Sequence, residues 1–393
     1  MGYLLSIVIP TKNRYKTLIP LIKALAKLDV NHNDLEIVIE DNSENNEEFQ
    51  TFFETTDQTN IKYFYSKEWR SVSDNSNQAI LHSTGKYVSF IGDDDAVGRQ
   101  IVDVARLMEE YQIDSCGCDY TLYRWPEALL HDKNSFEYHS KGAFVRWPQI
   151  DKELDDMLRN GIQSKKNIPG VYHGIVSRNI LNHVYEKTGT FFPGPSPDMA
   201  NSVAVSLYVK RHMITSIPFL IDGYSKSSTG HLTEKKAHIG KLEEQSFLPK
   251  NVLRNWTEEI PKIWLPNTIW PESAIQAFSK CGRQDLTEKF NYTAMYIKIS
   301  ILYPQCKGLC REYLKKYSTI KNIIATYIQI TITYLKNRIK DSGSRAAQEA
   351  IHVKEPISIE KAIKKSEEII DSRRQILRLK KLLDEKFYKA ETK

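Results

Sequence analysis

Short apolar segments alternate with helical segments through the first third of the chain, and this order constrains the fold more than any other feature. Segments with strand character, rich in β-branched and aromatic residues, occur at 4–10, 35–40, 61–65, 86–91 and 115–122. Apolar residues at helical spacing occur between them, at 15–28, 74–83 and 97–111. Strands that alternate with helices predict a mostly parallel sheet covered on both faces. We therefore expect an α/β fold.

The strand expected at 86–91 runs into three consecutive carboxylates, Asp93, Asp94 and Asp95. Because adjacent carboxylates repel one another, they are costly to bury without a cation. Oxygen ligands of this kind suit Mg²⁺ or Mn²⁺. Ligands also bind at the carboxyl ends of strands in open α/β sheets. The alternative is a solvated acidic turn without a ligand.

Polar residues also follow the first two expected strands. Thr11 and Arg14 follow the first strand, and Asp41 and Asn42 follow the second. In a parallel sheet these strand ends share one edge with the three aspartates. Thr and Arg can donate to a base or a phosphate, and a carboxylate can accept from a base or a ribose. Helix capping and turn formation would explain each cluster alone, but they do not explain the joint occurrence of the clusters in this order.

The order of these motifs resembles that of family 2 glycosyltransferases with the GT-A fold. The resemblance rests on SIVIPTKNR at 6–14, EIVIEDNSE at 36–44, NQAI at 77–80 and GKYVSFIGDDD at 85–95. It covers residues 3–125 and is expected to extend to about 230. It implies a GT-A-type, mostly parallel sheet flanked by helices and followed by a helical C-terminal region.

The resemblance also implies a role for each matching residue. Asp95, with Asp93, would bind Mn²⁺ or Mg²⁺ on the donor diphosphate. The residues expected to bind the nucleotide sugar are Pro10, Thr11, Arg14, Asp41, Asn42, Arg70, Asp93 and Asp94. Many relatives carry an arginine where this chain has Ser76, and Arg70 is a candidate to replace it.

A catalytic base is expected at Asp198, which follows the Pro-rich segment 193–197 and opens an expected helix. The resemblance implies that this carboxylate removes the proton of the acceptor hydroxyl in a single, inverting displacement. The alternative is an aspartate that only stabilises the start of a helix. His173 is a candidate for the acceptor cleft and His231 for a lid over the diphosphate. The alternatives are a structural histidine and a plain surface loop.

The resulting prediction is a metal-dependent, inverting glycosyltransferase that transfers a hexosyl or N-acetylhexosaminyl group. The donor would be a nucleotide-diphosphate sugar, and the acceptor a hydroxyl of a glycan or a lipid-linked molecule. The family's usual setting is bacterial surface-polysaccharide synthesis, such as O-antigen or capsule. One alternative is an assembly subunit that binds a sugar nucleotide without turnover. The other is a sugar-1-phosphate nucleotidyltransferase, which normally carries a Gly-rich loop where this chain has PTKNR at 10–14. No nucleic-acid partner is expected.

The chain of 393 residues is long for one domain. We expect a glycosyltransferase domain at 1–235, with a nucleotide-sugar half at 1–125 and an acceptor half at 126–235. A helical region at 236–340 and a basic tail at 341–393 would follow. The net charge of +6 originates in residues 336–393, which hold 16 Lys and Arg against 10 Asp and Glu. This excess suggests an anionic membrane surface as a partner.

Two C-terminal segments carry amphipathic patterns. Residues 311–340 combine apolar and basic side chains, which predicts a helix lying in a membrane interface. Residues 358–388 repeat apolar residues at seven-residue steps, which predicts a short coiled coil, a homo-oligomer contact or packing against another helix. The alternative for both segments is a helix that covers the protein's own core.

The first residues do not predict a secretory signal, because charged residues follow the first apolar run at once. No apolar run approaches the ~18 residues of a spanning helix. The five cysteines are scattered without zinc spacing, which is typical of reduced thiols. We therefore expect a cytoplasmic protein, with the inner face of the plasma membrane as a candidate peripheral location.

Overall fold

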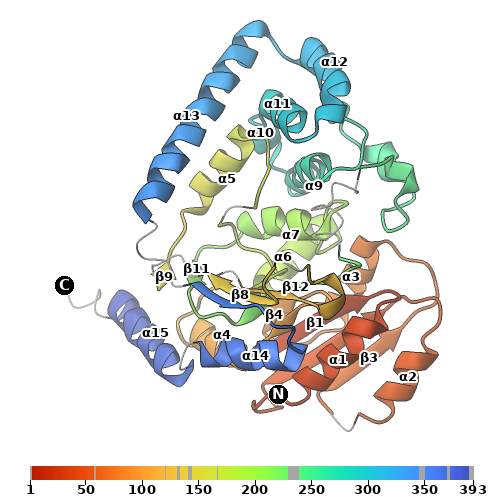
Figure 1. The fold of residues 1–393 in the computed structure, drawn as a ribbon, viewed down its shortest axis with the longest axis vertical. Helices are drawn as coiled ribbons and strands as arrows, with labels where there is room; N and C mark the ends of the chain where they lie inside the picture. Colours follow the sequence, from red (N-terminus) through yellow and green to blue (C-terminus); the bar gives the residue numbers. More distant parts are fainter. Residues whose placement is uncertain are drawn as a thin grey trace.

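The computed structural model describes residues 2–56, 59–119, 121–130, 133–139, 144–165, 167–228, 239–344, 350–369 and 372–388. A mixed sheet of eight strands lies at the centre of the N-terminal part (Figure 1). Its order is β3-β2-β1-β4-β10-β6-β11-β9. The strands are β1 (Leu5–Thr11), β2 (Leu35–Asp41), β3 (Ile61–Tyr65), β4 (Tyr87–Phe90), β6 (Ser115–Cys118), β9 (Val145–Arg146), β10 (Gly174–Ser177) and β11 (His212–Thr215). The predicted α/β fold is confirmed.

The first four strands are parallel, so their carboxyl ends meet at one edge. β1 pairs with β2 up to Thr11 opposite Asp41, and with β4 up to Val8 opposite Phe90. Successive side chains of β1 point to opposite faces of the sheet. Ile7 and Ile9 are buried in the hydrophobic cluster on one face, and Val8 is buried in the cluster on the other. This two-sided burial explains the nearly continuous apolar run in the sequence.

Helices cover both faces of the sheet. α1 (Tyr15–Leu25) and α4 (Gln100–Glu110) pack on the face of Ile7 and Ile9. α3 (Val72–Leu81), α6 (Arg178–Thr188) and α7 (Pro197–Ser206) pack on the face of Val8. α2 (Glu47–Phe53) packs beside α1 near the edge strand β3.

The segment 115–122, expected as a single strand, and the later apolar run 214–221 are each divided between two sheets. Residues 115–122 form β6 and then β7 (Thr121–Arg124), and residues 214–221 belong to β11 and β12 (Leu220–Tyr224). β7 and β12 lie in a second sheet of order β13-β8-β7-β12-β5, with β5 (Ala96–Val97), β8 (Phe136–His139) and β13 (Ala350–Val353). The break after β6 coincides with buried Asp119, which pairs with Arg146 at 2.6 Å. The first sheet is mixed because β10 runs antiparallel to both β4 and β6.

A second hydrophobic core joins α5 (Ile150–Arg159) and α7 to the later helices. These helices are α9 (Pro266–Lys280), α10 (Gln284–Thr287), α11 (Tyr292–Leu302), α12 (Lys307–Tyr317) and α13 (Ile320–Ser344). Among the described residues, no helix is both long enough and apolar enough to cross a bilayer.

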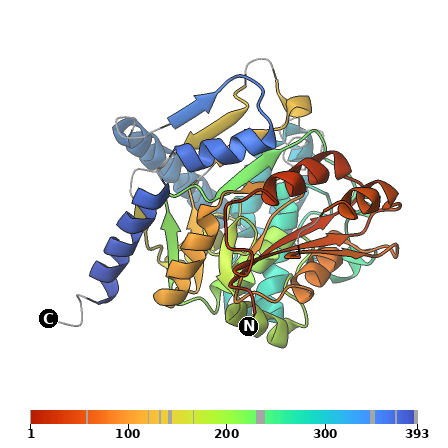
Figure 2. The same ribbon diagram turned by 90° about the horizontal axis from the view of Figure 1, so that it is seen from below.

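After α13 the chain returns to the first sheet region (Figure 2). β13 pairs with β8, α14 (Ile359–Glu368) packs against α1, and α15 (Ser372–Phe387) packs against α4. Ile359, Ile363, Leu379 and Leu383 are buried in the same core as α1 and α4. Part of the apolar pattern at 358–388 therefore packs against other helices of this chain, whereas Leu377 is exposed. The domain boundaries at 235 and 340 remain predictions.

Candidate active site

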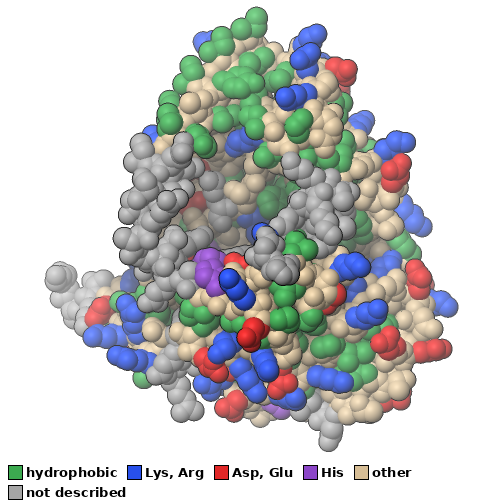
Figure 3. Space-filling model, in the orientation of Figure 1, with side chains coloured by type: hydrophobic (Ala, Val, Ile, Leu, Met, Phe, Trp, Pro, Cys, Tyr) green, Lys and Arg blue, Asp and Glu red, His purple; other side chains and the backbone are tan. Residues whose placement is uncertain are grey.

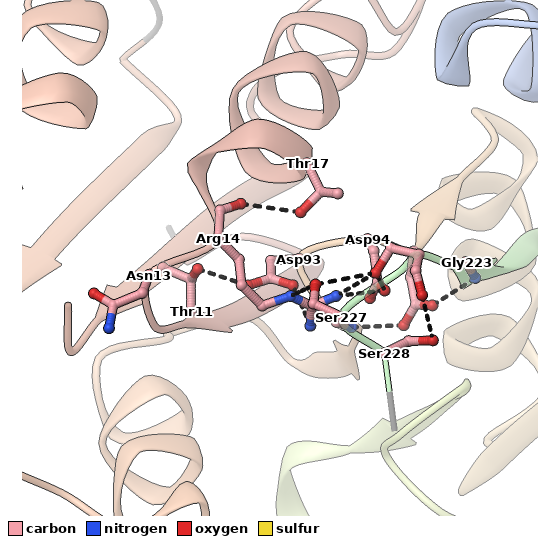
Figure 4. Close-up of polar contacts among 12 residues, drawn as sticks. Thr11, Asn13, Arg14, Thr17, Asp93, Asp94, Gly223, Ser227 and Ser228 are labelled. Carbon is pink, nitrogen blue, oxygen red and sulfur yellow. Dashed lines mark hydrogen bonds and ion pairs between the residues drawn. The ribbon is translucent and has the colours of Figure 1, made fainter. Parts of the chain in front are cut away.

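The loop after β1 reaches the aspartates after β4, as the parallel strand ends predict. The Thr11 hydroxyl donates to Asp93 Oδ2 at 2.6 Å, and Arg14 Nη1 lies 2.8 Å from Asp93 Oδ1. Arg14 Nη2 lies 2.5 Å from Asp94 Oδ2, so one guanidinium bridges two carboxylates (Figure 4). Burial lowers the pKa of Arg14, but the two carboxylates outweigh it and raise that pKa above its usual value.

A third segment, the end of β12 with the loop after it, completes this cluster. The Ser225 hydroxyl donates to Asp94 Oδ2 at 2.6 Å, and Arg14 Nη2 donates to Ser225 Oγ at 2.7 Å. Arg14 Nε also donates to Ser227 Oγ at 3.1 Å. The serines lie just after β12, and no motif in the sequence pointed to them.

Asp95 is held more firmly than its neighbours. The backbone N–H of Gly92 donates to Asp95 Oδ2 at 2.6 Å, and that of Gly223 donates to Oδ1 at 2.7 Å. His173 Nε2 lies 2.8 Å from the same Oδ2. Burial raises the pKa of Asp95, but His173 and the two backbone donors outweigh it and lower that pKa. Asp95 is therefore an anion with a fixed orientation.

Asp222 of β12 joins Asp95 and His173 in a group that could hold a cation. One ligand atom from each residue lies within 4.8 Å of the other two. Burial, with the nearby charges of Asp95 and Asp94, raises the pKa of Asp222 to about 6. Two crowded carboxylates and an imidazole suit a divalent ion that accepts oxygen and nitrogen, such as Mn²⁺. The residues present therefore fit the cation that the resemblance implies.

Of the two metal ligands predicted from the sequence, Asp95 lies in the group that could hold a cation and Asp93 lies outside it, and metal binding by either residue stays a prediction. Asp93 contacts Thr11 and Arg14, and it is not part of the group formed by Asp95, His173 and Asp222. Asp222 could have been found by the reasoning applied to the three aspartates. It directly follows the apolar run 214–221, and it is a carboxylate close to a strand end.

Asp41 lies at the end of β2 and accepts three hydrogen bonds. Tyr15 Oη and Tyr63 Oη donate to Asp41 Oδ2 at 2.7 and 2.8 Å, and the Ser43 N–H donates to Oδ1 at 2.8 Å. Burial, with the Asp41 charge, raises the pKa of both tyrosines, so both hydroxyls stay protonated as donors. Asp41 thus orders the surrounding loops in the free protein, and contact with a nucleotide stays a prediction.

Asn42 and Arg70 shape the neighbouring loop. Asn42 Nδ2 donates to the carbonyls of Ser66 and Glu68 at 2.7 and 2.5 Å, and the Arg70 N–H donates to Asn42 Oδ1 at 2.9 Å. The Arg70 guanidinium pairs with buried Glu40 at 2.6 Å. Pro10 is the second-to-last residue of β1. A direct role of Pro10, Asn42 or Arg70 in donor binding remains a prediction.

Asp198 occupies the first turn of α7, where Ser196 Oγ donates to Asp198 Oδ1 at 2.5 Å. Lys165, which the sequence reasoning missed, interacts electrostatically with both Asp198 and Asp222. Burial lowers the pKa of Lys165, although the two carboxylates partly restore it. The base predicted from the sequence is therefore linked through one lysine to the cation group.

A cavity of about 290 Å³ opens beside the cation group. Its lining includes Lys165, Tyr172, His173, Asp222 and Arg146. The His173 ring stacks on Tyr172 with the centroids 4.0 Å apart. His173 therefore lines this cavity, and its role in an acceptor cleft stays a prediction. His231 lies outside the described residues, as does the lid predicted around it.

A comparison with known protein families identifies the N-terminal part of the chain. Residues 6–162 match the family model of glycosyl transferase family 2. This segment is a family 2 glycosyltransferase domain. Arg14, Asp41 and the three aspartates lie within the match, whereas His173, Asp198 and Asp222 lie beyond its end. The resemblance seen in the motifs is confirmed for this segment.

Solved structures of glycosyltransferases are similar to the chain at low identity. TarS 1–349 of S. aureus in complex with UDP-GlcNAc is 15% identical, with a TM-score of 0.47 over 85% of this chain and 92% of that chain. The mannosyltransferase PcManGT of Pyrobaculum calidifontis, in complex with GDP-Man and Mn²⁺, is 14% identical, with a TM-score of 0.42 over 84% and 87%. Against the longer TarS chain, the match covers 36% of that chain at a TM-score of 0.40. No curated protein matches the chain.

Proposed function

We propose that the chain is a metal-dependent, inverting glycosyltransferase. It would transfer a hexosyl or N-acetylhexosaminyl group from a nucleotide-diphosphate sugar to a hydroxyl of a glycan or lipid-linked acceptor. One observation carries the proposal: Asp95, His173 and Asp222 converge on one point beside the strand-end cluster of Arg14, Asp93 and Asp94. Bacterial surface-polysaccharide synthesis at the cytoplasmic face of the membrane is the setting that we propose for it.

Each part of the site has a distinct task in this reaction. A divalent cation bound by Asp95, His173 and Asp222 would offset the negative charge that develops on the diphosphate leaving group. Asp95 is oriented for this task by the N–H groups of Gly92 and Gly223. Arg14 is 26% exposed, so its guanidinium can also offer donors to a phosphate that enters the site.

Transfer requires a base and an attack from the face opposite the diphosphate. The acceptor oxygen forms a bond to the anomeric carbon while the bond from that carbon to the diphosphate oxygen breaks. The proton of the acceptor hydroxyl passes to the Asp198 carboxylate. Lys165 interacts electrostatically with both Asp198 and Asp222, so it lies between the proposed base and the proposed cation ligands.

The test is release of nucleoside diphosphate from a panel of nucleotide sugars, with and without EDTA. Asp222→Asn should lose most turnover, because it removes the charge of one proposed ligand and preserves its size. Asp103→Asn is the matched control, since it removes one carboxylate that is 43% exposed on the outer side of α4. Turnover that resists both EDTA and Asp222→Asn would refute the metal-dependent reaction.

The same assay separates the two alternatives. A nucleotidyltransferase would release pyrophosphate from a nucleoside triphosphate and a sugar 1-phosphate. An assembly subunit would bind a nucleotide sugar in a thermal-shift assay and release no diphosphate. Either outcome would replace the proposed reaction.

The helix α13 supports the proposed membrane location. Its outward face carries apolar side chains that are between 46% and 78% exposed: Ile320, Ile324, Tyr327, Ile328, Ile332, Tyr334 and Leu335. The less exposed side of the helix includes polar residues, with Thr326 buried and Gln329 Nε2 donating to the Arg159 carbonyl at 3.2 Å, and the half-buried Ile323 and Ile330. Figure 3 shows hydrophobic side chains gathered over α13 along the upper left edge. This helix therefore turns its apolar stripe toward the surroundings.

Exposed lysines near the apolar stripe of α13 favour an anionic lipid surface as its partner. Lys321 and Lys336 lie exposed on the same helix, and Lys315 and Lys316 lie exposed at the end of α12. An apolar stripe bordered by lysines is typical of a helix that lies in a membrane interface. Residues of α14 and α15 are buried in the same core as α1 and α4, so truncation of the tail would disturb the fold. The test must therefore use point substitutions.

Flotation with liposomes of anionic lipid tests this location. Ile324→Asp with Ile328→Asp should abolish binding, and high salt should weaken the binding of the unchanged protein. Thr331→Asp, at an exposed polar position of α13, adds a charge without removing an apolar side chain. Absence of binding at low salt, or binding that survives the double substitution, would remove the membrane from the proposal.

A further inference from the structure

Strand β13 brings a histidine from the C-terminal segment beside two polar residues of β8. The two strands are antiparallel, with His352 opposite Glu137 and Ala350 opposite His139. Residues two apart on a strand share a face, so Glu137, His139 and His352 all project from one side of this pair. Phe136 and Tyr138 project from the other side and are buried. The three polar side chains form the β8–β13 cluster.

The geometry of the β8–β13 cluster is that of a three-ligand metal site. One ligand atom from each of the three residues lies within 4.8 Å of the other two. His139 Nε2 lies 3.2 Å from Glu137 Oε2, and the rings of His139 and His352 have their centroids 5.2 Å apart. Neighbouring ligands of one tetrahedral zinc ion, about 2.0–2.2 Å from the metal, are separated by similar distances.

Two neighbouring residues orient these ligands. Arg124 donates to Glu137 Oε1, which leaves Oε2 on the side of His139. Asn134 Nδ2 lies 3.1 Å from His352 Nδ1, which leaves Nε2 of that ring for a metal. A half-turn of the Asn134 amide would place its oxygen on Nδ1, as a metal-bound imidazole requires. Such outer contacts are a regular part of metal sites, because they fix the tautomer and the ring orientation.

We propose that Glu137, His139 and His352 bind Zn²⁺, with water as a fourth ligand. Two imidazoles and one carboxylate favour Zn²⁺ over Mg²⁺, which prefers oxygen ligands. The site is separate from the group of Asp95, His173 and Asp222, with which it shares no residue. Two ligands come from β8 and one from β13, so the ion fastens the C-terminal segment to the glycosyltransferase domain.

Metal titration of the full-length protein tests the site directly. Metal-free protein would be titrated with Zn²⁺ against a chromogenic chelator, and with Co²⁺ while the visible absorption is recorded. His352→Ala and His139→Ala should each weaken Zn²⁺ binding by more than about 100-fold, since loss of a ligand should exceed the effect of a lost outer contact. Asn134→Ala should weaken it by about 10-fold, as expected for an outer contact. His32→Ala, an exposed histidine elsewhere on the surface, is the matched control.

His173→Ala separates this site from the proposed catalytic cation. The β8–β13 cluster should keep its Zn²⁺ and its Co²⁺ spectrum in His173→Ala and lose both in His352→Ala. If His352→Ala binds Zn²⁺ as tightly as the unchanged protein, the zinc site does not exist. If binding is lost only in His173→Ala, the metal belongs to the catalytic group alone, and the proposal is again overturned.

Proteolysis reports whether the ion fastens the C-terminal segment. Lys354 is exposed immediately after β13 and is a site for trypsin. If cleavage there requires β13 to open, Zn²⁺ at 100 times its dissociation constant should slow it by about 100-fold in the unchanged protein. Zn²⁺ should not slow cleavage in His352→Ala. Equal protection in both proteins would overturn the fastening role.

Discussion

Gly223→Ala should damage the active site through the backbone alone. A Cβ atom at Gly223 would lie 1.7 Å from the Asp94 carbonyl oxygen and 2.8 Å from the Asp95 nitrogen. Both neighbours are backbone atoms, so no side chain can turn away. To reach a contact of about 3 Å, β12 would have to move by more than 1 Å from the aspartates. That movement would lengthen the hydrogen bond from the Gly223 N–H to Asp95 Oδ1, now 2.7 Å.

The magnitude follows from two separate losses. Overpacking of a buried position costs about 1–3 kcal/mol, and a lost hydrogen bond to a buried carboxylate costs about 1.5–3 kcal/mol. We expect the free energy of unfolding to fall by about 2.5–6 kcal/mol. Turnover should fall by about 100-fold in the protein that remains folded, because a displacement of about 1 Å has that effect on a reacting geometry.

Urea unfolding and diphosphate release should be measured on the same preparation. Gly308→Ala is the matched control, since Gly308 lies in helix α12 with open space around it. That substitution should stabilise the protein by up to about 1 kcal/mol. A Gly223→Ala protein with nearly unchanged stability and turnover would refute the close approach of β12 to the aspartates.

Three further predictions concern other groups. Asp198→Asn should lower kcat by about 10²–10⁴-fold with little change in donor binding, and a rate near that of the unchanged enzyme would place the base elsewhere. Asp41→Ala should raise KM for the donor more than it lowers kcat, and urea unfolding should show a loss of about 2–4 kcal/mol as Tyr15 and Tyr63 lose their acceptor; an unchanged KM with a collapsed kcat would place Asp41 at the reacting bond. Burial lowers the pKa of His212 to about 4. As the pH falls below about 6.5, His212 therefore takes up a proton in the unfolded chain before it does so in the folded protein. The free energy of unfolding should fall by roughly 3 kcal/mol between about pH 6.5 and pH 4. Urea titrations across this range should show a flatter profile for His212→Gln, and an equally steep profile would mean that other groups cause the loss.

The fold of the nucleotide-sugar half could be predicted because each strand there shows its burial in its own residues. The residues of β1 are apolar on both faces, and Thr11, Arg14 and the three aspartates follow strands that are parallel neighbours. Parallel pairing alone is enough to bring these residues to one edge. The contacts of Arg14 with Asp93 and Asp94 are therefore a consequence of strand order that can be read from the chain.

Asp222 could have been selected as a candidate because it follows an apolar run, but the convergence of His173 and Asp222 on Asp95 could not be predicted in the same way. His173 and Asp222 reach Asp95 from segments 78 and 127 residues further along the chain, through an antiparallel strand and a second sheet. The chain passes from the first sheet to the second after β6 and after β11. The polar residues at these two points resemble ordinary turns, so the sequence gives no sign of the change of sheet. Gly223 shows the same limit, since its requirement comes from the backbone of Asp94 rather than from its own neighbours in sequence.

The C-terminal segment shows how one sequence pattern can support opposite structures. Residues 311–340 and 358–388 both repeat apolar side chains at helical spacing among lysines and arginines. In α14 and α15 that stripe is buried against α1 and α4, whereas in α13 it faces outward. The difference arises from the partners available: α1 and α4 offer an apolar surface, and α13 lies over polar groups such as the Arg159 carbonyl. The amphipathic pattern specifies that a face must be covered, and the tertiary structure decides whether protein or another surface covers it.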